Sequence, residues 1–230
     1  ATGNSPQSGG TFSHSGGSHN VLGTLTVGKN TASTGKYTLD STGQLTADAM
    51  VIGQSGTGLV AQTSGSASIS GAGGLVIGSN AGALGSYSLD GGTLTVDGPE
   101  YVALSAIGNS NQAGGMFSQS SGVHRVGSLS TGHSAGAVGS MCLTGGTFVS
   151  SGVESIGRSG IGNFSQTGGS NASAGDINIG ANAGSSGTYG LSGGFASAPN
   201  IYVGGNSSGA GGTGKLTINA TLTVPGTITV

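Results

Sequence analysis

The sequence predicts an all-β fold, a single parallel β-solenoid, on the basis of three observations. A strand motif of the form Gly-x-aromatic-x-Gln or Leu, followed by a glycine-containing turn, recurs nine times at intervals of about 25 residues. Apolar residues alternate with a period of two, as in Leu25-Thr26-Val27, which is typical of strands and not of helices. Turn glycines stand at the same place in each repeat. Self-similarity at a fixed period indicates a solenoid of stacked coils.

The repeat divides the chain into coils of one kind. The coil starts are Gly10, Gly35, Gly58, Gly85, Gly115, Gly139, Gly162, Gly187 and Gly214. A constant strand motif with turns of variable length suits stacked strands, because the turns can bulge outward. We therefore predict a single β-solenoid domain over residues 1–230, with about nine coils of about 25 residues each.

The first strand of each coil supplies one column of the expected core. Its third position is aromatic in most coils, and stacking like on like would bury a continuous core that no single coil could bury alone. The aromatic members of this column are Phe12, Tyr37, Tyr87, Phe117, Phe164 and Tyr189.

The last strand of each coil supplies a second core column, made by the apolar residue that precedes a glycine. The glycine would provide the positive φ at the corner where the chain turns. We expect a shorter strand between these two, as in Thr93–Val96 and Thr147–Val149. The isoleucines of the second column are Ile52, Ile77, Ile107, Ile156 and Ile179.

The fifth position of the first strand alternates between polar and apolar residues. Leucine occupies it in the even coils, and the odd coils carry His14, Gln62, Gln119 and Gln166. The building block is therefore a pair of coils, about 50 residues long. Because an unpaired buried amide costs about 1–3 kcal/mol, we expect each glutamine to bind backbone groups at a coil corner and to fix the strand register. A polar groove for a ligand is the alternative.

The glycine-rich strands resemble a known group of proteins. The segments Phe164–Gly169, Ile177–Gly180 and Gly187–Gly194 are similar to the repeats of bacterial autotransporter passengers and related secreted β-solenoid surface proteins. The resemblance covers essentially the whole chain. It implies a right-handed parallel β-helix, exported from a bacterium and displayed at the surface or released. The membrane barrel of autotransporters has no counterpart in this sequence.

The search for catalytic residues favours a non-enzyme. Asp40 and Asp90 occupy matching positions two coils apart, roughly 9–10 Å for strands stacked at about 4.8 Å, which is near the spacing of an inverting glycosidase pair. Later even coils place Thr144 and Ser192 there, so turn-forming aspartates are favoured. The four histidines are too scattered for a metal set, and we expect no cofactor. Threonine-rich strands fall at different phases of the coil, which disfavours an ice-binding ladder.

Charge and hydropathy exclude two classes of partner. Five Lys and Arg residues in all and a pI near 6.0 leave no nucleic-acid footprint. No stretch approaches the roughly 20 apolar residues of a membrane span. The start Ala1-Thr2-Gly3 suits a mature end left by signal cleavage, which predicts an extracellular or bacterial cell-surface location. The single cysteine, Cys142, allows no internal disulfide.

The two ends of the repeat suggest self-assembly. Solenoid ends expose unpaired strand edges, and no charged or helical cap is evident in the sequence. Head-to-tail stacking into a filament or surface fibre would cover them. A piece of a longer fibre is the competing interpretation. A further alternative is an autotransporter-passenger-like adhesin that presents turns to a glycan or a host surface, with the coil Gly85–Gly114 and its segment Pro99–Tyr101 as the candidate bulge. The predicted assembly residues are Phe12, Leu216, Ile218, Ile228 and Val230.

Overall fold

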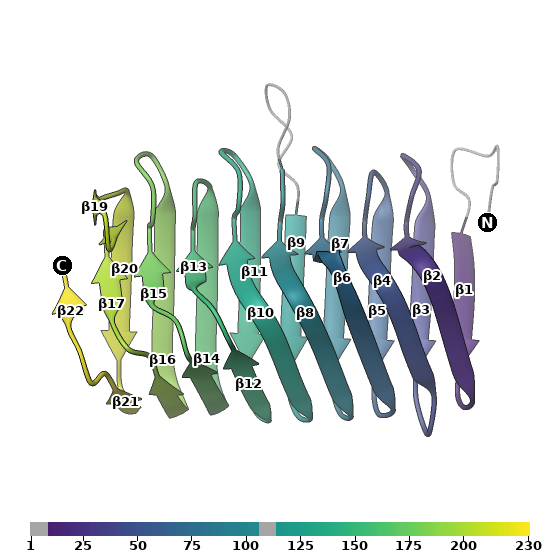
Figure 1. Cartoon of the computed structure of the whole chain (residues 1–230). Helices are drawn as coiled ribbons and strands as arrows, with labels where there is room; N and C mark the ends of the chain where they lie inside the picture. The colour runs from purple at the N-terminus through teal and green to yellow at the C-terminus, as the bar shows by residue number, and fades with distance from the viewer. Residues whose placement is uncertain (1–8, 106–113) are drawn as a thin grey trace.

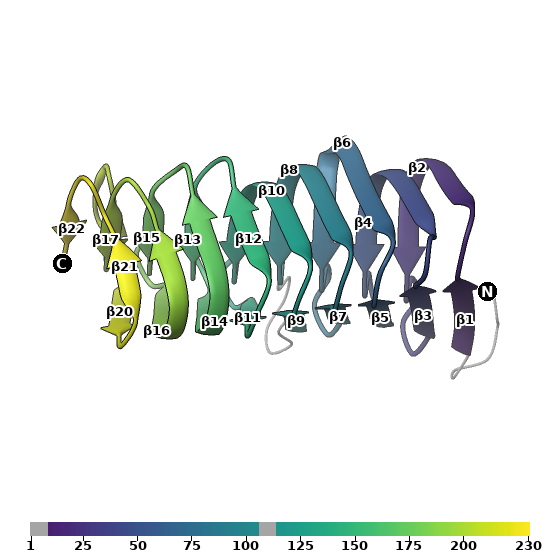
Figure 2. The ribbon, with the colours of Figure 1, turned by 90° about the horizontal axis from the view of Figure 1, so that it is seen from below.

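The chain forms a rod of stacked coils (Figures 1 and 2). The computed structural model describes residues 9–105 and 114–230. Within these ranges every strand pairing is parallel except that of one short hairpin, and no helix is present. It follows that the described part of the chain holds no helix that is long and apolar enough to cross a membrane. The prediction of an all-β parallel solenoid is confirmed.

Nine strands, one per coil, form the first face of the rod, called face A here. Each pairs in parallel with the equivalent strand one coil away, with the motif glycines and aromatic residues in register. Face A consists of β1 (Gly9–His14), β3 (Thr34–Leu39), β5 (Thr57–Gln62), β7 (Leu84–Leu89), β9 (Gly114–Gln119), β11 (Val138–Leu143), the first part of β14 (Ile161–Ser173), the first part of β16 (Ser186–Ser197) and β20 (Thr213–Ile218).

The rest of each coil forms two further faces, B and C. In the first five coils one long strand with a bend and a register shift covers both: β2 (Ser18–Val27), β4 (Gln44–Ile52), β6 (Ser66–Ile77), β8 (Thr93–Val102) and β10 (Val123–Thr131). In the later coils the strands of face C are separate: β13 (Glu154–Ile156), β15 (Ile177–Ile179), β17 (Ile201–Val203) and β22 (Ile228–Thr229). Face B then comprises β12 (Thr147–Ser150), the second parts of β14 and β16, and β21 (Thr221–Thr223), while a hairpin of β18 (Gly205–Asn206) and β19 (Gly209–Ala210) follows β17. The predicted short middle strand is the strand of face B. In the first five coils it is continuous with the strand of face C, and in the later coils the two are separate strands.

The two predicted core columns lie inside the rod. Nine of their members are buried: Tyr37, Tyr87, Phe117, Phe164, Tyr189, Ile52, Ile77, Ile156 and Ile179. Neighbouring rings stack, with centroids 5.2 Å apart for Tyr87 and Phe117 and 4.8 Å apart for Phe164 and Tyr189. Phe12 differs from the prediction of a core residue. Its side chain is 49% exposed, because β1 pairs only with β3 and no described strand covers its other edge.

The second column passes through a different residue in the fourth coil. The sequence predicts Ile107 there, but Val102 pairs with both Ile77 and Thr131 and fills that place in the core. Ile107 itself lies outside the described residues. The segment Pro99–Tyr101 belongs to β8 and is no bulge, which is why the column comes five residues earlier than predicted. Ala103 then turns the corner with a φ of 65°, where other coils have glycine.

Close backbone contacts explain the glycine at the corner of each coil. Gly53 has a φ of 70°, and a Cβ atom added there would collide with the carbonyl oxygen of Leu84. The motif glycine Gly58 lies against the backbone nitrogen of Gly53, which leaves no room for a side chain. At the corner between faces C and A, the backbone of one coil lies directly against the backbone of the next. Both positions therefore need glycine, and the two glycines recur together.

Candidate functional site

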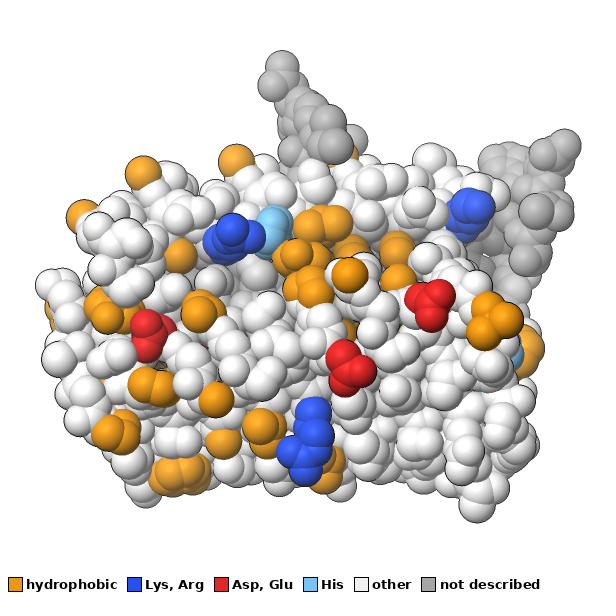
Figure 3. All heavy atoms as spheres, viewed as in Figure 1, with side chains coloured by type: hydrophobic (Ala, Val, Ile, Leu, Met, Phe, Trp, Pro, Cys, Tyr) orange, Lys and Arg blue, Asp and Glu red, His pale blue; other side chains and the backbone are white. Residues whose placement is uncertain are grey.

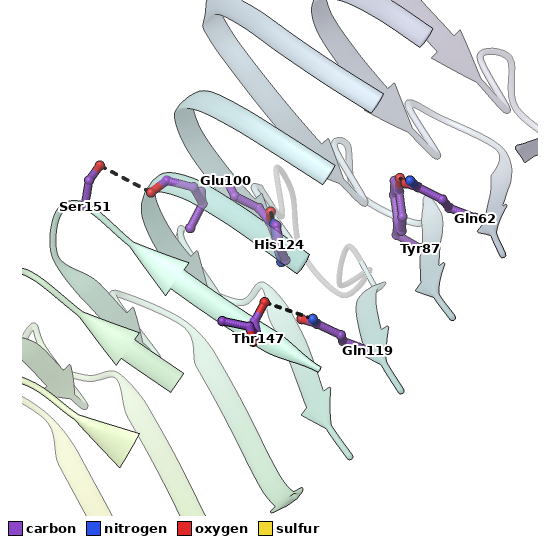
Figure 4. A network of polar contacts seen from close by, with 8 residues as sticks. Gln62, Tyr87, Glu100, Gln119, His124, Thr147 and Ser151 are labelled. Atoms are coloured by element: carbon purple, nitrogen blue, oxygen red, sulfur yellow. Dashed lines mark hydrogen bonds and ion pairs between the residues drawn. The ribbon is translucent and has the colours of Figure 1, made fainter. Parts of the chain in front are cut away.

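A ladder of tyrosine and glutamine side chains runs inside the rod and explains the two-coil period. The hydroxyl of Tyr87, in an even coil, donates a hydrogen bond to Oε1 of Gln62 in the preceding odd coil (Figure 4). The hydroxyl of Tyr189 donates to Oε1 of Gln166 over 2.7 Å. At the N-terminal end Tyr37 contacts Nδ1 of His14 at 2.9 Å. Burial of the Tyr37 side chain raises the pKa of its hydroxyl to about 12, so it stays protonated as a donor.

The glutamine amides bind the backbone at the coil corners, as predicted from the sequence. Nε2 of Gln62 donates to the carbonyl oxygens of Thr93 and Gly65, at 3.0 and 3.3 Å. Gln119 makes the same pair of bonds to Thr147 and Gly122, at 3.1 and 3.2 Å (Figure 4). The equivalent bonds of Gln166 reach Phe195 and Gly169, at 2.9 and 3.4 Å. Each amide therefore ties its own corner to the next coil and fixes the register.

One glutamine of the ladder lacks its tyrosine. Met141 pairs with Phe117 on face A and occupies the place that Tyr87 and Tyr189 hold in their coils. A thioether cannot donate a hydrogen bond, and Oε1 of Gln119 is buried without a partner among the described residues. The fifth and sixth coils therefore contain a defect in the ladder.

A buried pair of ionisable side chains lies beside this defect. Glu100 and His124 have no exposed side-chain surface, and Oε2 of Glu100 lies 2.8 Å from Nε2 of His124. The two atoms are close enough for an ion pair, but they are not aligned for a hydrogen bond. The imidazole of His124 stacks on Phe117 with a centroid distance of 4.5 Å. Figure 4 shows both side chains inside the rod near Gln119.

A second buried carboxyl belongs to a hydrogen-bonded network in the next coils. Oε1 of Glu154 accepts from the Ser150 hydroxyl at 2.9 Å, and Oε2 accepts from Nδ2 of Asn171 at 3.0 Å. The same amide lies 3.3 Å from the hydroxyl of Tyr189, which joins this network to the ladder. Burial raises the pKa of Glu154 above its ordinary value, and the bonds from Asn171 and Ser150 oppose that rise. Because these groups lie inside the rod, they act on folding and stability and do not face an external ligand.

The buried positions of Glu100, Glu154 and His124 were not predicted from the sequence. Glu154 precedes Ile156 by two residues, and the alternation of strands places both on the inner side. The same rule places Glu100 inside once Val102 is known to be the core residue. The signal was therefore present for Glu154 but hidden for Glu100 by the assignment of Ile107.

Of the histidines and aspartates that the sequence offers for chemistry, His14 and His19 lie together, with ring centroids 6.0 Å apart and both in contact with the Tyr37 hydroxyl. Asp90 accepts hydrogen bonds from the hydroxyls of Ser88 and Ser120, at 2.7 and 2.6 Å, so neighbouring serines satisfy it, and not its own backbone. The backbone carbonyl of Asp40 closes a turn by accepting from Gly43. Across residues 9–105 and 114–230, no three His, Cys, Asp or Glu side chains are grouped as a metal site would require.

The two end coils carry the predicted assembly residues. At the C-terminal end Ile218 and Ile228 are about half exposed, Val230 is 97% exposed and Leu216 is half-buried. At the other end Phe12 is the half-exposed residue of the same column as Leu216. The strands β20, β21 and β22 each pair with only one described neighbour. Both end coils therefore present unpaired strand edges together with apolar side chains.

No family model, no curated protein and no solved structure matches this chain. The resemblance to autotransporter passengers thus stays a prediction from the repeat motif.

Proposed function

We propose that this chain is a non-enzymatic extracellular structural protein, a β-solenoid subunit that stacks head to tail into a filament or surface fibre. One observation carries the proposal: the two end coils continue the same columns in compatible register. Strand direction is the same in both end coils, so a second copy can extend each column. The junction sets the odd ninth coil against the odd first coil, with Ile218 after Leu191 as the one break in the two-coil alternation.

Extending the observed register across the junction gives a definite pairing. On face A, β20 of one copy would lie beside β1 of the next, with Leu216 opposite Phe12 and Ile218 opposite His14. On face C, Ile228 would lie opposite Leu25, since both belong to the column that runs through Met50. The junction would bury apolar side chains, each worth about 1.5–3 kcal/mol when fully covered, and pair the strand edges on all three faces.

The composition supports an extracellular scaffold. Charged residues make up only 5% of the chain, and glycine accounts for 52 of its 230 residues. The outer surface is therefore rich in small and hydroxylated side chains, and the repeat resembles those of secreted bacterial surface proteins. A neutral and regular rod of this kind suits a structural role.

A disulfide trap tests the junction. In a Cys142→Ser background, Thr11→Cys and Lys215→Cys place two exposed cysteines at positions that the extended register makes neighbours. Adjacent strands bring Cα atoms within the 4.4–6.8 Å that a disulfide spans. Mild oxidation should give a ladder of covalent multimers, and negative-stain microscopy should show uniform fibres. The control pair, Thr11→Cys with Thr229→Cys, places the cysteines on different faces and should not cross-link.

A single charged substitution tests the same contact between copies without cross-linking. Ile218→Asp puts a charge on the end coil and should shorten the fibres to single rods. Ile161→Asp, at a side chain of similar exposure in the middle of the stack, is the matched control and should leave the fibres intact. Two results together would refute the proposal: the unmodified chain remains as isolated rods at every concentration tested, and the Thr11→Cys, Lys215→Cys variant gives no covalent multimers.

A further inference from the structure

A polar groove lies on the outside of face C, toward the C-terminal half of the rod. Its volume is about 460 Å³, and it lies over β8, β10, β13 and β15. Figure 3 shows this side of the molecule, on which one basic side chain and one histidine are in contact. Most of its lining belongs to the fourth to seventh coils, and its C-terminal wall, the hairpin at Asn206–Ser208, borders the last coil.

The floor of the groove is a row of outward side chains on neighbouring strands. Tyr101, Ser130, Ser155 and Asn178 are aligned in register from β8 to β15, and Tyr202 on β17 continues the row beyond the residues that line the groove. A tyrosine therefore stands at each end of three small polar residues. At about 4.8 Å per strand the row is roughly 19 Å long. This shape suits an elongated ligand that lies across the strands.

The wall nearer the C-terminus is made of amides and hydroxyls. The hairpin β18–β19 brings Asn206, Ser207 and Ser208 to the groove, and Asn182 comes from the turn after β15. These groups can both donate and accept hydrogen bonds, as the hydroxyls of a sugar require.

One floor residue has unused hydrogen-bonding capacity. The side chain of Asn178 makes no hydrogen bond to the described residues, and its Oδ1 is inaccessible to solvent and without a partner. A buried polar atom without a partner is costly, so a ligand whose binding turns the Asn178 amide toward the groove would supply the missing hydrogen bond.

A positive charge lies at the rim of the groove. The guanidinium of Arg158 contacts the ring nitrogens of His133 at 3.1 and 3.2 Å, and the His133 ring packs edge-on against Tyr101 at a centroid distance of 4.5 Å. Burial, with a smaller contribution from the Arg158 charge, lowers the pKa of His133, which keeps its ring neutral and able to accept from Arg158. Within the described residues the single ion pair is that of Glu100 with His124, so no carboxylate there neutralises Arg158.

We propose that this groove binds an oligosaccharide that carries a carboxylate. The Arg158 fork would hold the carboxylate, since guanidinium and carboxylate match in planar, two-point hydrogen bonding. Asn178 and the amides of the wall would bind the hydroxyls, and the ring of Tyr101 would pack on the apolar face of a sugar ring. Successive sugars could follow successive strands across the floor. A polynucleotide would need more than one cation here, and the groove supplies only Arg158.

Titration of the whole chain with a hyaluronan tetrasaccharide, in which glucuronate alternates with N-acetylglucosamine, tests the proposal. Binding is followed by the NMR shifts of the side-chain amide groups of Asn178 and Asn206. We expect saturable shifts with a Kd of about 1 mM or tighter, and binding at least about tenfold weaker in Arg158→Gln. Arg125→Gln removes the same charge on face B and should bind like the unmodified chain.

Two further probes separate the chemistry of the ligand. The neutral tetramer of N-acetylglucosamine should bind at least about tenfold more weakly than the acidic sugar, because it lacks the carboxylate. Tetraglutamate carries carboxylates without sugar rings and should not shift Asn178. Equal binding of either probe, an equal loss in Arg125→Gln, or no shift with hyaluronan would overturn the proposal. The hairpin wall also borders Thr229 and Val230 of the last coil, so the titrations are repeated in the Ile218→Asp variant, which separates binding from fibre formation.

Discussion

The hydroxyl of Tyr87 donates a hydrogen bond to Oε1 of Gln62, one coil earlier in the stack. This contact joins an even coil to an odd coil, while Nε2 of the same glutamine binds the carbonyl oxygen of Thr93 in the even coil. The pair recurs as Tyr189 and Gln166. The repeating unit of the rod is therefore two coils linked by one buried amide.

Removing the Tyr87 hydroxyl should destabilise the rod. Tyr87→Phe keeps the ring stacked on Phe117 but leaves Oε1 of Gln62 buried and unpaired, which costs about 1–3 kcal/mol. The free energy of unfolding from urea denaturation measures the loss. Tyr202→Phe, on the outer surface, is the control and should change stability by less than about 0.5 kcal/mol. Equal effects of the two substitutions would show that the buried hydroxyl contributes nothing specific.

Gln62 and Gln119 should respond differently to the same substitution. Leucine fills this position in the even coils, so its shape suits the site. Gln62→Leu leaves the Tyr87 hydroxyl without an acceptor, whereas Gln119→Leu removes an oxygen that already lacks a partner. Gln62→Leu should therefore cost about 1–3 kcal/mol more than Gln119→Leu in urea denaturation. A larger loss for Gln119→Leu would contradict the defect at Met141.

Glu154→Gln should make the rod more stable toward neutral pH. Burial raises the folded-state pKa of Glu154 above its ordinary value of 4.5, so the folded protein holds a proton that the unfolded chain releases. Stability is then highest below the unfolded-state pKa and falls as pH rises from there through the folded-state pKa. The glutamine of this variant cannot titrate, its oxygen can still accept from Nδ2 of Asn171, and its amide nitrogen can donate to the Ser150 hydroxyl oxygen.

The measurement is the difference in unfolding free energy between Glu154→Gln and the unmodified chain as a function of pH. The difference should shift in favour of the variant across the window between the two pKa values. Asp97→Asn, at an exposed carboxyl on the outside of β8, should show no such trend. A difference for Glu154→Gln that is flat in pH would mean that burial does not perturb this carboxyl.

Most of the fold could be predicted from the repeat, because every coil of a solenoid follows the same local pattern of strands and turns. Strand alternation was enough to place Phe164 and Ile52 in the core, and the cost of a buried amide was enough to predict the backbone bonds of Gln166. The rule failed at Ile107, where the apolar-residue-before-glycine pattern occurs a few residues after the true corner at Val102 and Ala103. Local pattern cannot tell which of two similar segments the neighbouring coils pair with.

The groove was harder to foresee. Tyr101, Asn178 and Arg158 come from three coils, and each is an ordinary surface residue in its own strand or turn. Only the register of the stack brings them to one place. The sequence predicted a binding bulge at Pro99–Tyr101. Tyr101 does line the groove, but it lies on the regular strand β8 and not on a bulge.

The buried pair of Glu100 and His124 has a consequence for folding. Near-identical coils can pair in the wrong register during folding. A segment that is displaced by two coils would still pack against an aromatic column and a glutamine. Such a slip would separate Glu100 from His124 and leave both buried polar side chains without a partner, which costs about 1–3 kcal/mol for each group. This buried pair therefore distinguishes the fourth and fifth coils from the others and favours the correct alignment of the stack.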